Sequence, residues 1–184
     1  MNHPQVVLAL SSLCLFAAAP AARADAPAGP LKVPPQACPG PGAAAPLFSF
    51  PIPLAQGGER ASLNALRAKK KPIVLAFWAH NCAPCILEMP ALQRLSAEWG
   101  DRVSVLLVHV GEDEPKMRDA LERWNIKLTS ALDESAKKSQ GEYCVTALPR
   151  LFVLDAKGTV QAALGALGDQ FEARVRGEVG KLLM

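Results

Sequence analysis

Two cysteines, Cys82 and Cys85, stand three residues apart in the stretch FWAHNCAPCILEMP, which covers residues 77–90. Thiols at this spacing can exchange with a disulfide, supply half of a metal site or form a structural bridge. The pair directly follows the apolar run PIVLAFW, residues 72–78, and precedes a stretch with helical spacing. The elements that hold the two thiols therefore help to decide which chemistry they perform.

Strand and helix patterns alternate on either side of the two cysteines. Residues 72–78 are apolar without interruption, as expected of a strand buried on both faces, and residues 103–110 form a second central strand. The spacing of large apolar residues predicts a helix after Cys82, with a kink at Pro90 and an end at Gly100.

The rest of the chain supplies the remaining elements of an α/β domain. A short N-terminal hairpin is expected around Gly57 and Gly58, and another helix has Pro115 in its first turn. The segments RLFVLD and TVQAALG flank a turn at Gly158 as an antiparallel hairpin, and a terminal helix follows. Alternating units make the first part of the sheet parallel. We predict a mixed central sheet flanked by helices on both faces.

The first residues are typical of an export signal. Residues 6–16 form a short apolar run, and residues 22–24 read Ala-Arg-Ala, a small-x-small pattern that suits a signal peptidase. We predict a signal peptide at 1–24, a Pro-, Ala- and Gly-rich arm or linker at 25–46 and a folded domain at 47–184. Cleavage would release the protein into a bacterial periplasm, whereas an uncleaved segment would anchor it to the inner membrane.

Cys82 is predicted to lie where a helix begins, and this position favours a reactive thiolate. The first-turn N–H groups of a helix lack intrahelical partners and carry partial positive charge. Such sites lower a cysteine pKa from ~8.5 into a range of about 3.5–7.5. The thiolate attacks a disulfide, and Cys85 can then release the mixed disulfide. Since Pro84 has no N–H to leave unpaired, a first turn tolerates it. A redox pair thus explains location, spacing and proline together.

The stretch FWAHNCAPCILEMP resembles the active-site segment of the thioredoxin superfamily, especially its exported TlpA-like branch of thiol–disulfide oxidoreductases. Pro90 matches the proline that kinks the active-site helix in that family. The similarity extends to PLFSFPIPLAQGGERASLNALRAKKKPIVLAFWA and to YCVTALPRLFVLDAKGTV, so that roughly residues 46–184 are covered. The resemblance implies a thioredoxin-like fold, an enzyme that exchanges a dithiol with protein disulfides, no organic cofactor and no metal.

The same resemblance implies roles for individual residues. Cys82 would be the attacking thiol, and Cys85 would resolve the mixed disulfide. Pro149 matches the cis-proline that faces the disulfide in the family, and Leu148 before it would offer its backbone to the substrate chain. Trp78 would complete the substrate-facing surface.

Four positions near the cysteines add to the comparison or depart from it. Ala76 stands where cytoplasmic thioredoxins keep a buried aspartate, so that base is missing. Glu88 matches an acid of the TlpA-like pattern, and it is either a proton relay or an exposed helix residue. Asn81 replaces a usual large aromatic residue, and His80 either tunes the thiolate pKa or is a solvated loop residue.

Two further cysteines, Cys38 and Cys144, admit more than one interpretation. Loss of Cys14 with the signal would leave four of the five cysteines in an oxidising compartment, an even number that permits two bridges. A bridge between Cys38 and Cys144 would pin the arm close to Pro149. Otherwise the two thiols stay unpaired, or the arm thiol pairs with a partner protein.

Three rival functions were weighed against the redox pair. Cys82, Cys85 and Cys144 with His80 or His109 could bind copper or zinc, although no second closely spaced ligand pair is visible. Peroxidase chemistry would need the Thr-rich surroundings and activating arginine of peroxide-reducing relatives, which this segment lacks. A merely structural bridge over so short a loop would stabilise little.

We therefore predict an exported thiol–disulfide oxidoreductase, with a copper- or zinc-binding protein of the same fold as the alternative. The resemblance favours a reductase that acts on protein substrates, for example haem-attachment cysteines or the thiols of a metalloprotein. Electrons would come from another protein's dithiol. Lys and Arg number 20 against 17 Asp and Glu, a balance that gives no reason to expect nucleic acid. We expect a monomer, with membrane contact only through an uncleaved signal.

Overall fold

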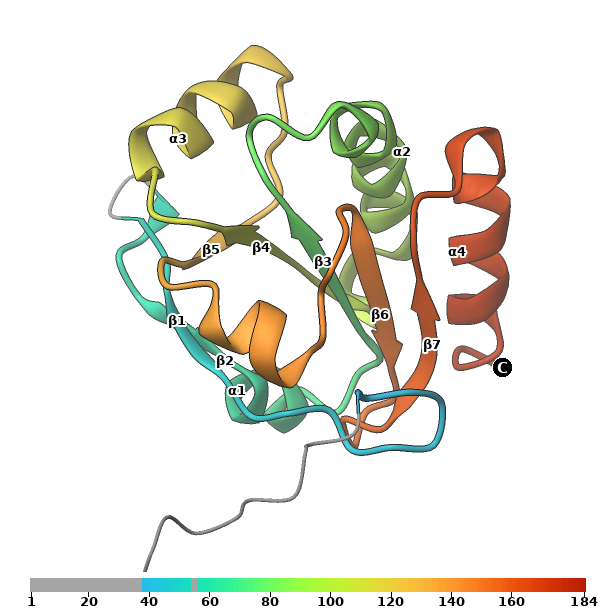
Figure 1. Cartoon of the computed structure of the whole chain (residues 1–184). Helices are drawn as coiled ribbons and strands as arrows, with labels where there is room; N and C mark the ends of the chain where they lie inside the picture. The colour runs from blue at the N-terminus through green and yellow to red at the C-terminus, as the bar shows by residue number, and fades with distance from the viewer. Residues whose placement is uncertain (1–37, 54–55) are drawn as a thin grey trace, which may run out of the picture. The chain divides into compact units, whose positions relative to one another are not determined.

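The computed structural model describes residues 38–53 and 56–184, and the predicted signal peptide and the first part of the arm lie outside them. The main elements follow one another in the order shown in Figure 1. They are β1 (Ser49–Pro51), β2 (Arg60–Ser62), α1 (Leu63–Ala68), β3 (Ile73–Trp78), α2 (Ala83–Trp99), β4 (Ser104–Val110), α3 (Glu114–Arg123), β5 (Ser130–Asp133), β6 (Arg150–Leu154), β7 (Val160–Leu164) and α4 (Phe171–Gly180).

Five of the strands form one mixed sheet in the order β5-β4-β3-β6-β7 (Figure 1). β3, β4 and β5 are parallel to one another, whereas β6 runs antiparallel to β3 and β7 antiparallel to β6. β1 and β2 form the predicted N-terminal hairpin as a separate antiparallel pair. The predicted α/β class and mixed sheet are confirmed. The sequence prediction missed β5, which extends the sheet beyond β4.

The two faces of the sheet are covered by different elements because alternate strand residues point in opposite directions. The even-numbered residues of β3 pack with apolar side chains of α2, α3 and α4. Its odd-numbered residues pack with the β1–β2 hairpin, α1 and Tyr143, which follows a π-helical segment at Lys137–Glu142. β3 is buried over its whole length, as predicted, and carries the chain from the core to the two cysteines.

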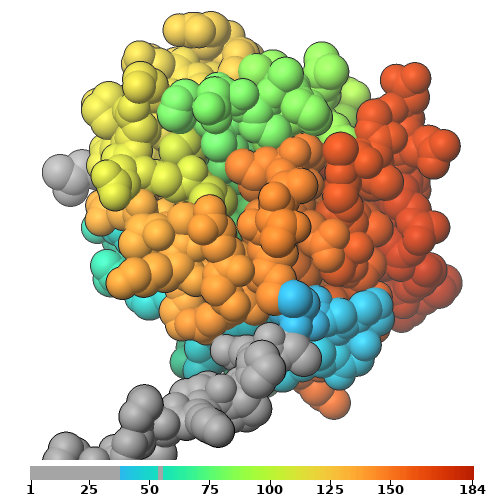
Figure 2. All heavy atoms as spheres, viewed as in Figure 1, coloured from blue at the N-terminus to red at the C-terminus, as the bar shows by residue number. Residues whose placement is uncertain are grey.

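The described part of the Pro-rich arm, residues 38–46, is attached to the domain. Its Gly42 N–H donates to Val160 O at 2.8 Å, and Val160 N–H donates to Ala43 O at 2.8 Å. Figure 2 shows this blue segment packed against the β6–β7 end of the molecule. Residues 38–46 therefore border the β7 edge of the sheet.

Within residues 38–53 and 56–184, no helix has the length and apolar character needed to cross a membrane. The apolar run predicted as a signal lies in residues 1–24, outside the described part of the chain.

Candidate redox-active site

The two cysteines of the CxxC pair form a disulfide at the start of α2, with their Cα atoms 5.3 Å apart. Cys82 is the N-cap residue of the helix, and its Sγ accepts a hydrogen bond from the backbone N–H of Cys85 at 3.3 Å. Pro84 lies in the first turn, where it removes no helical hydrogen bond. The sulfur of Cys82 thus lies where unpaired N–H groups and the helix dipole stabilise negative charge.

The two sulfurs differ in access to solvent. The Cys85 residue is 1% exposed and packs in the core, whereas Cys82 is only partly buried. A bulky protein disulfide can approach Cys82 but has no path to Cys85. Cys82 is therefore the more accessible sulfur of the pair, and Cys85 is the shielded one.

The peptide bond between Leu148 and Pro149 is cis, in agreement with what the family resemblance implies. Pro149 and the buried Cys85 line one small cavity of about 20 Å³ at the base of the site. Leu148 is partly buried and packs at the edge of the core. The chain just before β6 thus lies against the CxxC pair.

Glu88 lines the same cavity as Cys85 and is only 4% exposed, so it is not an exposed helix residue. Its Oε1 accepts hydrogen bonds from the backbone N–H groups of Leu167 at 2.6 Å and Gly168 at 2.9 Å. Its Oε2 is buried and has no hydrogen-bond partner among the described residues. One oxygen thus fixes the position of the carboxyl group, and the other stays without a partner in the described structure. A cavity of this size has room for one water molecule between acid and thiol.

His80, in the loop between β3 and α2, stacks on His109 of β4, with ring centroids 5.5 Å apart and 17° between the ring planes. His109 Nε2 accepts the backbone N–H of His80 at 3.3 Å and lies 3.2 Å from His80 Nδ1. Burial, followed by the neighbouring His80, lowers the pKa of His109 from 6.5 to about 4. A neutral His109 therefore anchors the loop that leads to Cys82.

The contact of His109 with His80 was not predicted from the sequence, where His109 was considered as a possible metal ligand. His109 is 1% exposed, but its Nδ1 is buried without a hydrogen-bond partner in the described chain. It is the penultimate residue of β4 and is paired with Trp78, the last residue of β3. The signal that could have revealed this contact was a histidine near the end of β4, the strand that pairs with the strand leading to the CxxC pair.

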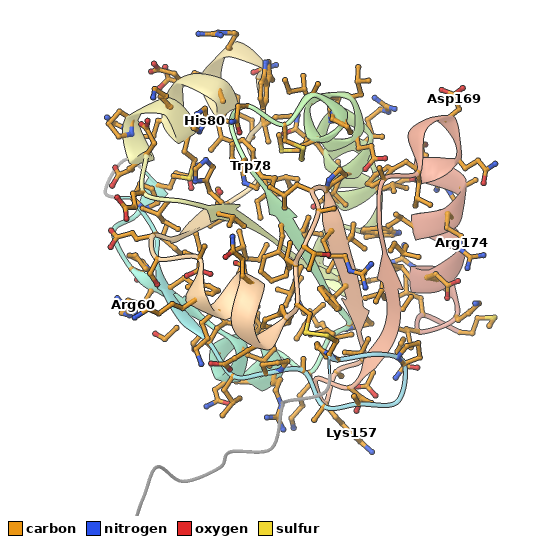
Figure 3. The ribbon with its side chains drawn as sticks, in the orientation of Figure 1. Arg60, Trp78, His80, Lys157, Asp169 and Arg174 are labelled. Carbon is orange, nitrogen blue, oxygen red and sulfur yellow. A yellow bond between two sulfur atoms is a disulfide. The ribbon has the colours of Figure 1, made fainter. Side chains whose placement is uncertain are left out.

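Trp78 does not lie on the substrate-facing surface, and that prediction is wrong. Its side chain is only 1% exposed, and its Nε1–H donates to Ser130 Oγ at 3.1 Å. The ring makes edge contacts with His109 and Trp124. Trp78 belongs to the even-numbered face of β3 and therefore points beneath the helices, while His80 lies in the loop beyond it (Figure 3).

A second disulfide joins Cys38 to Cys144 across 106 positions of sequence, with Cα atoms 5.5 Å apart. Of the open interpretations, the structure therefore shows the bridge. It ties the arm to the segment before β6, and both cysteines line a groove of about 320 Å³ together with Leu148 and Pro149. The bridge thus forms part of the surface next to the CxxC pair.

The metal-site alternative required Cys144 to join the CxxC pair and a histidine, but Cys144 is bonded to Cys38. Among the residues that the structure describes, no three His, Cys, Asp or Glu side chains are grouped as metal ligands. The residues of this possible ligand set are thus divided between two disulfides and a histidine pair.

A cis-proline opposite a CxxC pair, on a mixed sheet of this order, agrees with the thioredoxin superfamily. By fold and site, the chain is a thioredoxin-like protein of the thiol–disulfide oxidoreductase class. Comparison with family models gives the narrower placement: residues 41–163 match the AhpC/TSA family, and the chain belongs to it.

Individual proteins support the same class. The chain is 32% identical over 107 residues to the thioredoxin-like protein YneN of Bacillus subtilis. The matched segment covers 56% of this chain and 61% of YneN. It is 28% identical over 126 residues to the thiol-disulfide oxidoreductase ResA of Bacillus cereus, covering 68% and 70% of the two chains. A solved structure from Chlorobium tepidum, assigned as a thiol:disulfide interchange protein DsbE, shares the fold. Its TM-score is 0.71 at 20% identity, covering 79% of this chain and 99% of that one.

Proposed function

We propose that the protein reduces disulfides in other exported proteins by exchange with its Cys82–Cys85 pair. The observation that carries this proposal is the position of the Cys82 sulfur, which is accessible and accepts the N–H of Cys85 at the start of α2. In the reduced protein the same position holds a thiolate, the form that attacks a disulfide.

In the first step, the Cys82 thiolate attacks one sulfur of a substrate disulfide. The substrate S–S bond breaks, a mixed disulfide with Cys82 forms, and one substrate thiolate leaves. The cis-Pro149 and the backbone of Leu148 border the CxxC pair and would hold the substrate chain during this step. Trp78 is buried, so it supports the site from below.

In the second step, Cys85 attacks the Cys82 sulfur of the mixed disulfide. The Cys85 thiol must first lose its proton, and the free Oε2 of Glu88 in the same cavity is the acceptor we propose. The second substrate thiolate leaves, and the Cys82–Cys85 disulfide forms. Two electrons have then passed from the enzyme dithiol to the substrate.

Another protein's dithiol must return two electrons to the oxidised pair before the next turnover. Relatives with such motifs work in either direction, since reduction potentials span about 150 mV between thioredoxin and DsbA. We propose the reducing direction, with haem-attachment cysteines or metalloprotein thiols as substrates and a monomer as the working form. His80 would tune the thiolate of Cys82 from its place in the loop.

We also propose that residues 1–24 direct export to the periplasm and that residues 25–46 connect this signal to the domain at 47–184. The Cys38–Cys144 disulfide supports export, because such bridges persist in oxidising compartments. If the signal remains uncleaved, the same segment would anchor the domain to the inner membrane.

The experiment combines insulin reduction with equilibration against glutathione, using purified mature protein. We expect turnover of insulin, a potential more negative than that of glutathione, and loss of activity in Cys82→Ser. Cys85→Ser should accumulate the mixed disulfide. An oxidised peptide with a C-x-x-C-H sequence then tests haem-attachment cysteines as substrates. A CxxC pair that exchanges with none of these disulfides would exclude the proposed function.

A further inference from the structure

Arg150 follows cis-Pro149 and begins β6, next to the site of exchange. Its guanidinium carbon lies 5.3 Å from the centroid of the buried Phe152 ring. Its Nε is buried without a hydrogen-bond partner, and no ion pair involves Arg150 within residues 38–53 and 56–184. The side chain is thus a partly buried cation without a counter-charge in the described structure.

The contact with Phe152 explains the position of the Arg150 side chain but leaves its hydrogen-bonding capacity unused. A guanidinium stacked on a ring keeps its N–H donors in its own plane, pointing away from the ring. A buried donor without a partner is unfavourable by about 1–3 kcal/mol. A carboxylate satisfies two donors of the fork at once, and the ring has already fixed the plane of that fork.

The surroundings of Arg150 suit an incoming carboxylate. Arg150 lines the groove of about 320 Å³ that the Cys38–Cys144 disulfide and Leu148 also border. The other described residues that line the groove are small or neutral, and no acidic side chain is among them. Among the described residues that line the groove, Arg150 is therefore the one charge that a bound chain would meet.

The groove also leads to the reacting sulfurs. Pro149 and Arg150 line both this groove and the small cavity that contains Cys85 and Glu88. A substrate chain that runs beside Leu148 toward Cys82 would therefore pass within reach of the guanidinium. Thr146 and Ala147 are exposed along the same stretch, so the backbone there is accessible.

We propose that this groove binds an extended segment of the substrate protein and that Arg150 pairs with an Asp or Glu carboxylate in that segment. The inference rests on the proposed exchange function and deepens it. Arg150 selects substrates that carry an acidic residue near the target cysteine. An attractive charge pair at a partly exposed groove also raises the rate at which enzyme and substrate associate. Salt screens this attraction, so the preference for acidic substrates decreases as salt increases.

The test uses peptides with one cysteine that is capped as a mixed disulfide with neutral 2-mercaptoethanol. Each acidic peptide carries Glu at one position on either side of the cysteine, and its twin carries Gln there. Reduced wild-type protein should react with at least one Glu peptide about tenfold faster than with its Gln twin. This is about the factor that one charge-assisted hydrogen bond contributes. High salt should decrease this ratio.

Arg150→Gln should abolish the preference for Glu over Gln within each peptide pair, whereas Arg150→Lys should keep part of the preference. Lys157→Gln is the matched control, because it removes one positive charge at the opposite end of the molecule from His80 (Figure 3). It should keep the full preference. The wild-type ratio and its salt dependence test the proposal without any variant.

Two outcomes would overturn the inference, and they are distinguishable from failure of the proposed function. Equal rates for Glu and Gln peptides, or a preference that persists in Arg150→Gln, would exclude the role of Arg150 while exchange itself remains. Absence of exchange with every peptide and with insulin would exclude the exchange function and this inference together.

Discussion

The backbone N–H of Cys85 donates a hydrogen bond to Sγ of Cys82 at 3.3 Å, so the sulfur of Cys82 takes the place of an N-cap side chain on α2. The donor residue is itself the second member of the redox pair and is buried behind the first. One short helical turn thus gives the two sulfurs different surroundings, one at the start of the helix and one in the core. The predictions that follow test the consequences of this relationship.

The two thiols of the reduced protein should differ strongly in reactivity. Cys82 is partly exposed and its thiolate is stabilised, whereas Cys85 is in the core, so iodoacetamide should modify Cys82 first. Mass spectrometry of the peptides after a short reaction measures the ratio, and unfolded protein provides the control with both thiols modified. Equal modification of both cysteines in the folded protein would contradict the assignment.

Replacement of Glu88 should slow the second step of exchange. Glu88→Gln keeps an oxygen for the N–H groups of Leu167 and Gly168 but removes the base, so the mixed disulfide should resolve roughly 100-fold more slowly. Stopped-flow measurement of release from the mixed disulfide reports this step. Glu98→Gln makes the same change at an exposed position of α2 and should have no effect. An unchanged rate in Glu88→Gln would show that Cys85 loses its proton elsewhere.

The stability of the protein should decrease as the pH falls from about 6.5 to about 4. Since His109 has its pKa lowered to about 4 in the folded chain, the unfolded state binds the proton first in this interval. The loss should be on the order of 2–3 kcal/mol of unfolding free energy.

Urea unfolding at a series of pH values, compared with His109→Asn, measures this contribution of His109. Above about pH 7 both proteins have a neutral side chain at this position, so the difference between their pH profiles isolates the proton. His80 and Asp113 face His109 and are unchanged in the variant. Parallel pH profiles of the unfolding free energy for the two proteins would show that protonation of His109 does not destabilise the folded state.

The Cys38–Cys144 disulfide should stabilise the domain without taking part in exchange. It links positions 106 residues apart, and closure of so long a loop contributes up to about 4–5 kcal/mol on the chain-entropy estimate. Denaturant unfolding of the Cys38→Ser, Cys144→Ser double variant measures the loss, and insulin reduction should persist in the folded variant. Equal stability of variant and wild type would mean that the disulfide contributes nothing, and that contacts such as Gly42 with Val160 are sufficient to hold the arm.

Much of the fold could be predicted because the strongest sequence signals coincide with the core. Residues 72–78 are uninterrupted apolar residues and became the buried strand β3, and Gly158 marked the turn between β6 and β7. β5 was missed because its sequence, SALD, is short and has a polar residue at each end. It is recognisable as a strand only through its pairing with β4, a long-range relationship.

The candidate site was less predictable because burial at its edges depends on tertiary packing. Motif spacing located both cysteines. The family resemblance located the cis-proline, but it placed Trp78 on the substrate-facing surface, whereas the alternation of β3 directs the ring inward. Glu88 lies on the helix that carries the cysteines, yet a loop far along the chain, Leu167 and Gly168, buries it. The contact between His80 and His109 joins the ends of two paired strands. It depends on how these strands are aligned, which the local sequence alone does not reveal.

The most direct test of the account is the thiol pKa of Cys82 in the reduced protein, followed by the ultraviolet absorbance of its thiolate, with Cys82→Ser as the blank. The helix start predicts a value well below the ~8.5 of a free cysteine, within about 3.5–7.5, and exchange faster than that of a free dithiol. A pKa at or above ~8.5, together with exchange no faster than that of a small dithiol, would contradict the account.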